Sequence, residues 1–73
     1  MKKKIIIKIE GMSCMHCAKT VMEALENLEN VLKVKVNLKR QEALVIYKDD
    51  IDTNLIKETI NDLGYNFVEA ISC

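Results

Sequence analysis

The chain has 73 residues, of which 49% are hydrophobic and 30% are charged. This length suits one small domain, 1–73, and is too short for a substrate cleft between two domains, which weighs against most enzymes. The 11 basic and 11 acidic residues cancel, and this neutrality argues against nucleic acid as the main partner.

The first element predicted is a half-buried strand over residues 3–9, with Ile5, Ile7 and Ile9 on one face and Lys4 and Lys8 on the other. The lysines at the start resemble the beginning of a secretory signal. However, the apolar run ends after three residues, at Lys8, whereas such a signal needs about 7–15 apolar residues. No run is long enough to span a bilayer. We therefore expect a cytoplasmic protein without direct membrane insertion.

A helix and a β-hairpin follow. Apolar residues recur at helical spacing from about Met15 to Leu28, which predicts an amphipathic helix. Alternation returns over residues 31–38 and 42–48, and the polar turn 39–41 separates these two strands. The predicted inward-facing residues are Ala18, Val21, Met22, Leu25 and Leu28 in the helix, Leu32, Val34, Val36 and Leu38 in the first arm, and Ala43, Val45 and Tyr47 in the second.

A second helix begins at an N-cap, Asp52 or Thr53, and ends before Gly64, where a helix C-terminal glycine belongs. Its predicted inner face consists of Leu55, Ile56, Thr59, Ile60 and Leu63. Residues 65–71 are predicted to form a last strand, although they alternate poorly.

The predicted order is βαββαβ, which gives an α+β fold with a four-stranded antiparallel sheet and both helices on one face. The first and third strands are expected side by side in the middle of the sheet. The other sheet face is then open, and Ile6, Leu44 and Ile46 point toward it. Two interpretations stay open: ordinary scattered apolar residues, or a small contact patch for a partner or a dimer.

The most informative segment runs from Gly11 to Cys17 and reads Gly-Met-Ser-Cys-Met-His-Cys. Cys14 and Cys17 lie where a loop enters a helix, so both sulfur atoms can turn toward one point. The helix N-terminus favours thiolate over thiol, and thiolate is the form that binds metal. The third cysteine, Cys73, is expected roughly 20 Å away, because the last strand runs away from this loop.

Soft thiolates select Cu(I), zinc or iron–sulfur clusters. Iron–sulfur clusters and structural zinc normally require four ligands, and His16, between the cysteines, is expected to point away from the sulfur pair. Two thiolates suffice for Cu(I), so we predict one Cu(I) per monomer, exchanged stepwise with the cysteine pair of a partner. Dithiol redox catalysis is a weaker alternative, because thioredoxin-like folds place a cis-proline beside the cysteines and this chain has no proline.

Four segments of the chain resemble the heavy-metal-associated (HMA) domain. Within that family, the resemblance is strongest to bacterial copper chaperones and to the N-terminal modules of copper-transporting P-type ATPases. The four segments are residues 11–17, the helix with Ala18, Val21 and Leu25, the strand 34–38, and Leu63-Gly64-Tyr65. The resemblance runs from about Ile5 to Val68 and implies a ferredoxin-like fold without catalytic activity.

The resemblance also implies a function and roles for individual residues. The chain would carry Cu(I) on Cys14 and Cys17 to a P-type ATPase, as a monomer without metal and in some members as a copper-bridged dimer. Met12 would support the loop from below, and Tyr65 would cover the site. Related domains bind zinc, cadmium or mercury, or belong to a larger transporter. Ser13 favours copper, since zinc and cadmium types often have an acidic residue there. His16 is either an electrostatic tuner of the site or an ordinary exposed histidine.

Overall fold

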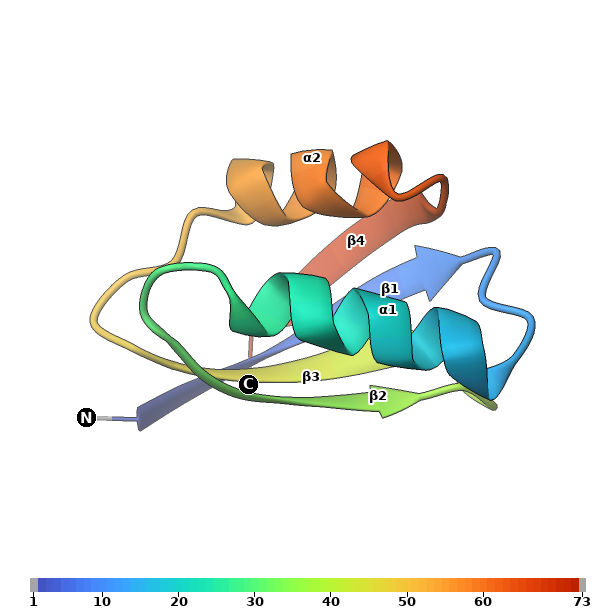
Figure 1. Ribbon diagram of the computed structural model, residues 1–73. Coiled ribbons are helices and arrows are strands. Elements are labelled where there is room, and N and C mark those ends of the chain that lie inside the picture. Colours follow the sequence, from blue (N-terminus) through green and yellow to red (C-terminus); the bar gives the residue numbers. More distant parts are fainter. Residues whose placement is uncertain (1, 73) are drawn as a thin grey trace.

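The computed structural model describes residues 2–72, which form a four-stranded antiparallel sheet with two helices on one face (Figure 1). The elements are β1 (Lys2–Glu10), α1 (Met15–Glu26), β2 (Val31–Asn37), β3 (Glu42–Lys48), α2 (Thr53–Asp62) and β4 (Asn66–Ser72). The strand order is β2-β3-β1-β4, with β1 and β3 in the middle. The predicted ferredoxin-like βαββαβ fold is therefore confirmed. Within residues 2–72, no helix is long and apolar enough to cross a membrane.

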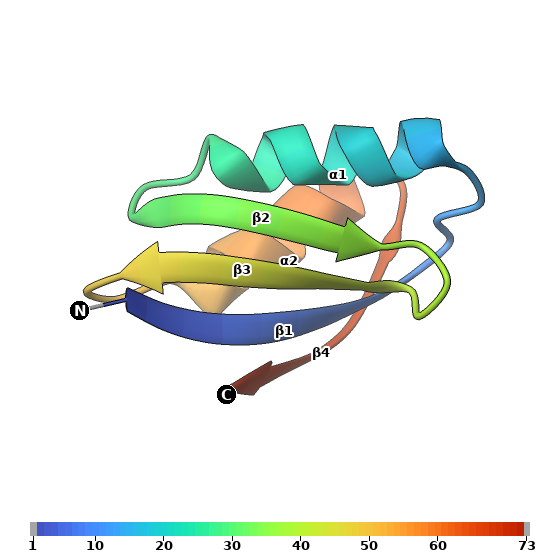
Figure 2. The same cartoon turned by 90° about the horizontal axis from the view of Figure 1, so that it is seen from below.

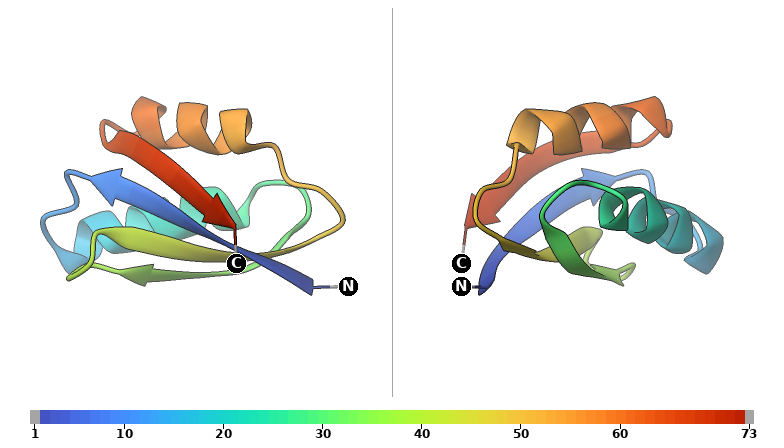
Figure 3. Two further views of the ribbon diagram at one scale, coloured as in Figure 1. Left: turned by 180° about the vertical axis from the view of Figure 1, so that it is seen from behind. Right: turned by 60° about the vertical axis from the view of Figure 1, so that its left-hand side comes forward.

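The hydrophobic core lies between the sheet and the helices (Figure 3). Alternate residues of the central strands face the helices, and each helix covers them with residues spaced four apart, as periods of 2 and 3.6 require. The fully buried side chains of highest volume are Ile7, Ile9, Val21, Leu25, Val45, Ile56 and Ile60.

Two details of the predicted pattern are wrong. Leu32 is 48% exposed, because the register of β2 against β3 shifts between Val31 and Lys33, and such a bulge breaks the alternation. Leu55 is 42% exposed, because it lies about 100° around the helix from the buried Ile56, at the margin of the apolar stripe. Helix α1 ends at Glu26 with Asn27 as its C-cap, and Leu28 packs against the core from the following turn.

Three connections gather at one end of the sheet (Figure 2). They are the loop from β1 to α1, the β2–β3 turn and the loop from α2 to β4. Each contains a residue with positive φ: Gly11 at 101°, Gln41 at 52° and Gly64 at 94°. This end of the molecule brings together segments that are far apart in the sequence, and it contains the cysteine pair.

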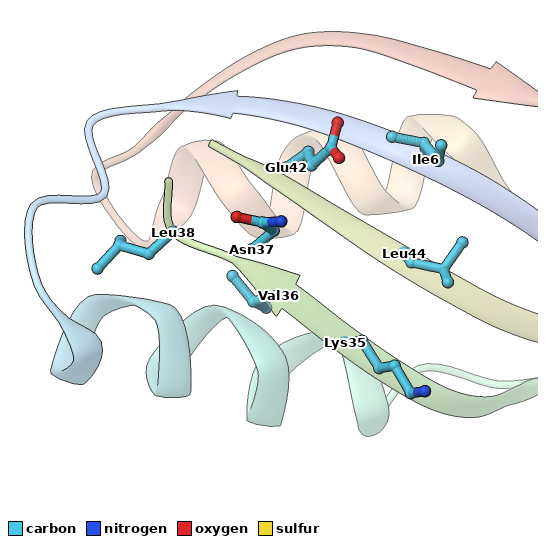
Figure 4. A pocket seen from close by; sticks show the side chains of 7 residues that line it. All are labelled: Ile6, Lys35, Val36, Asn37, Leu38, Glu42 and Leu44. Carbon is cyan, nitrogen blue, oxygen red and sulfur yellow. The ribbon is translucent and has the colours of Figure 1, made fainter. Parts of the chain in front are cut away.

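The sheet face away from the helices is open, as predicted. Ile6, Leu44 and Lys35 line a shallow hollow on this side of β1, β3 and β2 (Figure 4). The strands and the β2–β3 turn carry nine of the eleven basic residues: Lys2, Lys3, Lys4, Lys8, Lys33, Lys35, Lys39, Arg40 and Lys48. The same segments carry three acidic residues, Glu10, Glu42 and Glu69. The net charge of zero therefore conceals a basic sheet layer and an acidic helical layer.

Candidate metal centre

The sulfur atoms of Cys14 and Cys17 converge at the start of α1. Cys14 is the N-cap residue, with extended backbone angles (φ −153°, ψ 171°), and Cys17 is the third residue of the helix. Their Sγ atoms lie 3.5 Å apart. Both are free cysteines; Cys14 is exposed and Cys17 half-buried. The predicted convergence of the two sulfur atoms is therefore present, at a spacing well beyond the roughly 2.05 Å of a disulfide bond.

The helix start supplies a positive potential at this point. The Cys14 side chain caps no backbone N–H group, and the first turn contains no acidic residue that would offset the dipole. The first N–H groups of a helix lack intrahelical acceptors and add partial positive charge. Negative charge on the sulfur pair is therefore favoured.

The pKa of the Cys17 thiol is lowered from its ordinary 9.0 to about 6. The largest cause is a hydrogen bond that the Tyr65 hydroxyl donates to the Cys17 thiolate, followed by one from the backbone N–H of Ser13 and one from the Cys14 thiol. The Ser13 hydroxyl lies 3.9 Å from the Cys17 sulfur and adds less. The pKa of Tyr65 is raised, because its phenol is a donor to this thiolate. Cys17 is therefore mainly thiolate at neutral pH.

The end of α2 brings Tyr65 to the cysteines. The N–H of Gly64 donates to the Asn61 carbonyl and the N–H of Tyr65 donates to the Ile60 carbonyl, which is the Schellman arrangement. Gly64 adopts the positive φ that this ending requires. Tyr65 then packs against the core, with its ring beside Gly11. The chain reversal at Gly64 thus places a phenol next to a loop more than 45 positions earlier.

Met12, which the family resemblance places beneath the loop, is buried in the core. Its side chain is 4% exposed and belongs to the core cluster. Both backbone polar groups of Met12, its N–H and its carbonyl, are hydrogen-bonded to the side chain of Gln41 in the β2–β3 turn. Sequence reasoning missed Gln41. A non-glycine residue with positive φ at the end of a hairpin turn is unusual enough to draw notice once the structure is known.

His16 is exposed, between the two cysteines. Within residues 2–72, no three Cys, His, Asp or Glu side chains are grouped closely enough to hold a metal ion together. Cys73 lies outside the described residues, so its expected distance from the pair stays a prediction. The candidate centre consists of two soft donors, of which Cys14 is exposed and Cys17 is half-buried.

This set of donors suits a metal ion that accepts low coordination. Two thiolates are too few for structural zinc, which takes four ligands, and for an iron–sulfur cluster. They are soft ligands of the kind that Cu(I) prefers.

Comparison with known proteins identifies the family. The model of the heavy-metal-associated domain matches residues 6–66. The chain belongs to the heavy-metal-associated domain family. Copper chaperone CopZ of Staphylococcus aureus is 39% identical over 64 residues, which cover 86% of this chain and 94% of that protein.

Solved structures of HMA domains are also similar to this chain. A CopZ metallochaperone superposes with a TM-score of 0.83 at 38% identity, covering 89% of this chain and 98% of the other. A copper-binding domain from a P-type ATPase gives a TM-score of 0.79 at 32% identity, covering 97% and 93%. This HMA domain is thus similar both to copper chaperones and to a copper-binding domain of a P-type ATPase.

Proposed function

We propose that this chain is a cytoplasmic Cu(I) chaperone, in which Cys14 and Cys17 bind one Cu(I) per monomer and pass it to a copper-transporting P-type ATPase. The observation that carries the proposal is the pair of sulfur atoms, 3.5 Å apart and accessible at the start of α1. Zinc carriage is less well supported, because zinc requires more donors than this pair provides.

Copper moves by exchange of thiolate ligands. Cu(I) starts on the Cys14 and Cys17 thiolates. A thiolate of the partner adds to the exposed metal and gives a three-coordinate intermediate. One of the original Cu–S bonds then breaks, and a second partner thiolate repeats the exchange. Copper stays Cu(I) throughout, and the released thiolates take up protons to the extent that their pKa values require.

The ATPase partner is supported by the family relationship. A copper-binding domain of a P-type ATPase shares 32% identity with this chain. A partner of this type shares the fold of this chain, and the proposed exchange requires that it present thiolates of its own. The cysteine pair of this chain lies at one end of its domain (Figure 2), where a partner can approach it.

The surface beside the cysteines is suited to contact with such a partner. Met15 is 74% exposed, and together with Ala18, Met22 and Val36 it lines an apolar hollow next to α1. Flexible methionine side chains adapt to different surfaces. An apolar patch that borders the metal site brings the partner's cysteines within reach of the copper.

Met15→Gln, which removes the apolar surface without adding charge beside the thiolates, is therefore expected to slow copper transfer several-fold while leaving Cu(I) affinity nearly unchanged. Protein loaded with one Cu(I) is mixed with the N-terminal domain of a copper ATPase, and copper is followed on both proteins after rapid separation. Leu55→Gln, which makes the same kind of change at an exposed apolar residue of α2, is the matched control. Transfer from the unmodified chain supports the chaperone function. Copper that stays on the loaded chain in the presence of excess partner domain contradicts it.

A further inference from the structure

We propose that Gln41 is a positioning residue for the metal site, acting as a two-sided clamp on the loop that carries Cys14. Its Oε1 accepts a hydrogen bond from the N–H of Met12 at 3.1 Å, and its Nε2 donates to the carbonyl oxygen of Met12 at 2.6 Å. The same Nε2 donates to the Leu38 carbonyl at 2.8 Å. One side chain therefore binds both polar groups of a single backbone position, as a neighbouring strand would.

The clamp connects two segments that are 29 positions apart in the sequence. The backbone of Gln41 strengthens the connection, because its carbonyl accepts from the N–H of Ile9 at 2.9 Å, at the end of β1. Bonds on both sides of Gly11 thus tie the chain to the β2–β3 turn. The clamped residue, Met12, is two positions before Cys14, and its side chain is fixed in the core.

The backbone conformation of Gln41 suggests that the side chain has a specific role. Its φ of 52° lies in the left-handed region, which is unfavourable for residues with a Cβ and which glycine adopts freely. Glycine would relax the turn and remove the clamp. The glutamine holds a strained conformation while its half-buried amide makes three hydrogen bonds.

This role deepens the proposed function and rests on it: the clamp would fix the path of the loop, and with it the position of the Cys14 sulfur opposite Cys17. Partners that orient metal ligands from behind typically change metal affinity about 10–100-fold when removed. For an indirect contact through the backbone, we expect an effect near the lower end of that range.

Gln41→Gly removes the clamp and relieves the left-handed strain of the turn. This relief offsets only part of the three lost hydrogen bonds, so the unfolding midpoint is expected to fall modestly. Hydrogen exchange of the Met12 amide in the metal-free protein is expected to accelerate about tenfold or more. Cu(I) affinity, measured by competition with a chelator, is expected to fall about tenfold. Lys39→Gly adds a glycine to the same turn and leaves the clamp intact, so it serves as the control.

The two readouts distinguish the clamp from the proposed function. Failure of the unmodified chain to bind Cu(I) overturns the proposed function, whereas exchange at Met12 tests the clamp without any metal. Unchanged Met12 exchange in Gln41→Gly overturns the clamp. Faster exchange with unchanged Cu(I) affinity overturns the positioning role, because the loop would then hold its cysteines without Gln41.

Discussion

Cys17→Ser is expected to weaken Cu(I) binding by well over about 100-fold, since loss of a direct ligand exceeds the 10–100-fold effect of losing a partner behind the ligands. Serine replaces a soft thiolate with a hard hydroxyl that stays protonated at neutral pH. Cys14→Ser is expected to have an effect of similar size, because the proposed site has two protein donors that lie 3.5 Å apart. Chelator competition at pH 7 measures the affinity of each variant.

Cys73→Ser is the matched control for these two substitutions. It removes the third cysteine of the sequence and is expected to leave Cu(I) affinity unchanged. Wild-type affinity in either Cys14→Ser or Cys17→Ser would rule out the two-sulfur site. A loss of affinity in Cys73→Ser would add a ligand that the proposed site does not contain.

Tyr65→Phe is expected to raise the pKa of Cys17 from about 6 toward its ordinary 9.0, because the Tyr65 hydroxyl is the largest cause of the lowered pKa. The ring stays in place to pack against the core, and only the hydrogen-bond donor is lost. The pH dependence of alkylation at Cys17, followed by mass spectrometry of the peptide, gives the midpoint directly. We expect weaker Cu(I) binding by the variant at pH 7, where protons then compete for the sulfur, and convergence with the wild type above about pH 9.

The same pKa shift makes stability depend on pH. The pKa of Cys17 is lower in the folded state than the ordinary 9.0 of the unfolded chain, so the unfolded state binds more protons between about pH 6 and 9. The contribution of this group to stability is full above pH 9 and is lost as the pH falls to about 6. Tyr65→Phe is expected to flatten this pH dependence of stability, and Tyr47→Phe, in β3, serves as the control.

In the alkylation experiment, equal midpoints for Tyr65→Phe and the wild type would contradict the role of the Tyr65 hydroxyl in lowering the pKa of Cys17.

Local patterns were enough to predict most of the fold. The alternation of Ile5, Ile7 and Ile9 and the helical spacing of Val21 and Leu25 are properties of short segments, and the structure buries all five residues. The bulge that turns Leu32 outward could not be predicted in this way. It depends on how β2 aligns with β3, and neither strand encodes that alignment alone.

Only those parts of the candidate site that involve residues close together in the sequence could be predicted. Cys14 and Cys17 are three positions apart at a helix start, and this short spacing places the N-cap residue beside the first turn of the helix. The contribution of Tyr65 could be expected only from the resemblance to the family, because the tyrosine is 48 positions from Cys17 in the sequence. Gln41 could not be found, since its contact with Met12 spans 29 positions and depends on a side-chain conformation.

X-ray absorption at the copper edge, on the protein loaded with one equivalent of Cu(I), tests the central claim most directly. The two-thiolate site requires a first coordination shell made of two sulfur atoms and a copper content that saturates at one ion per chain. A shell dominated by nitrogen or oxygen, or an unchanged sulfur shell in Cys14→Ser, would contradict it.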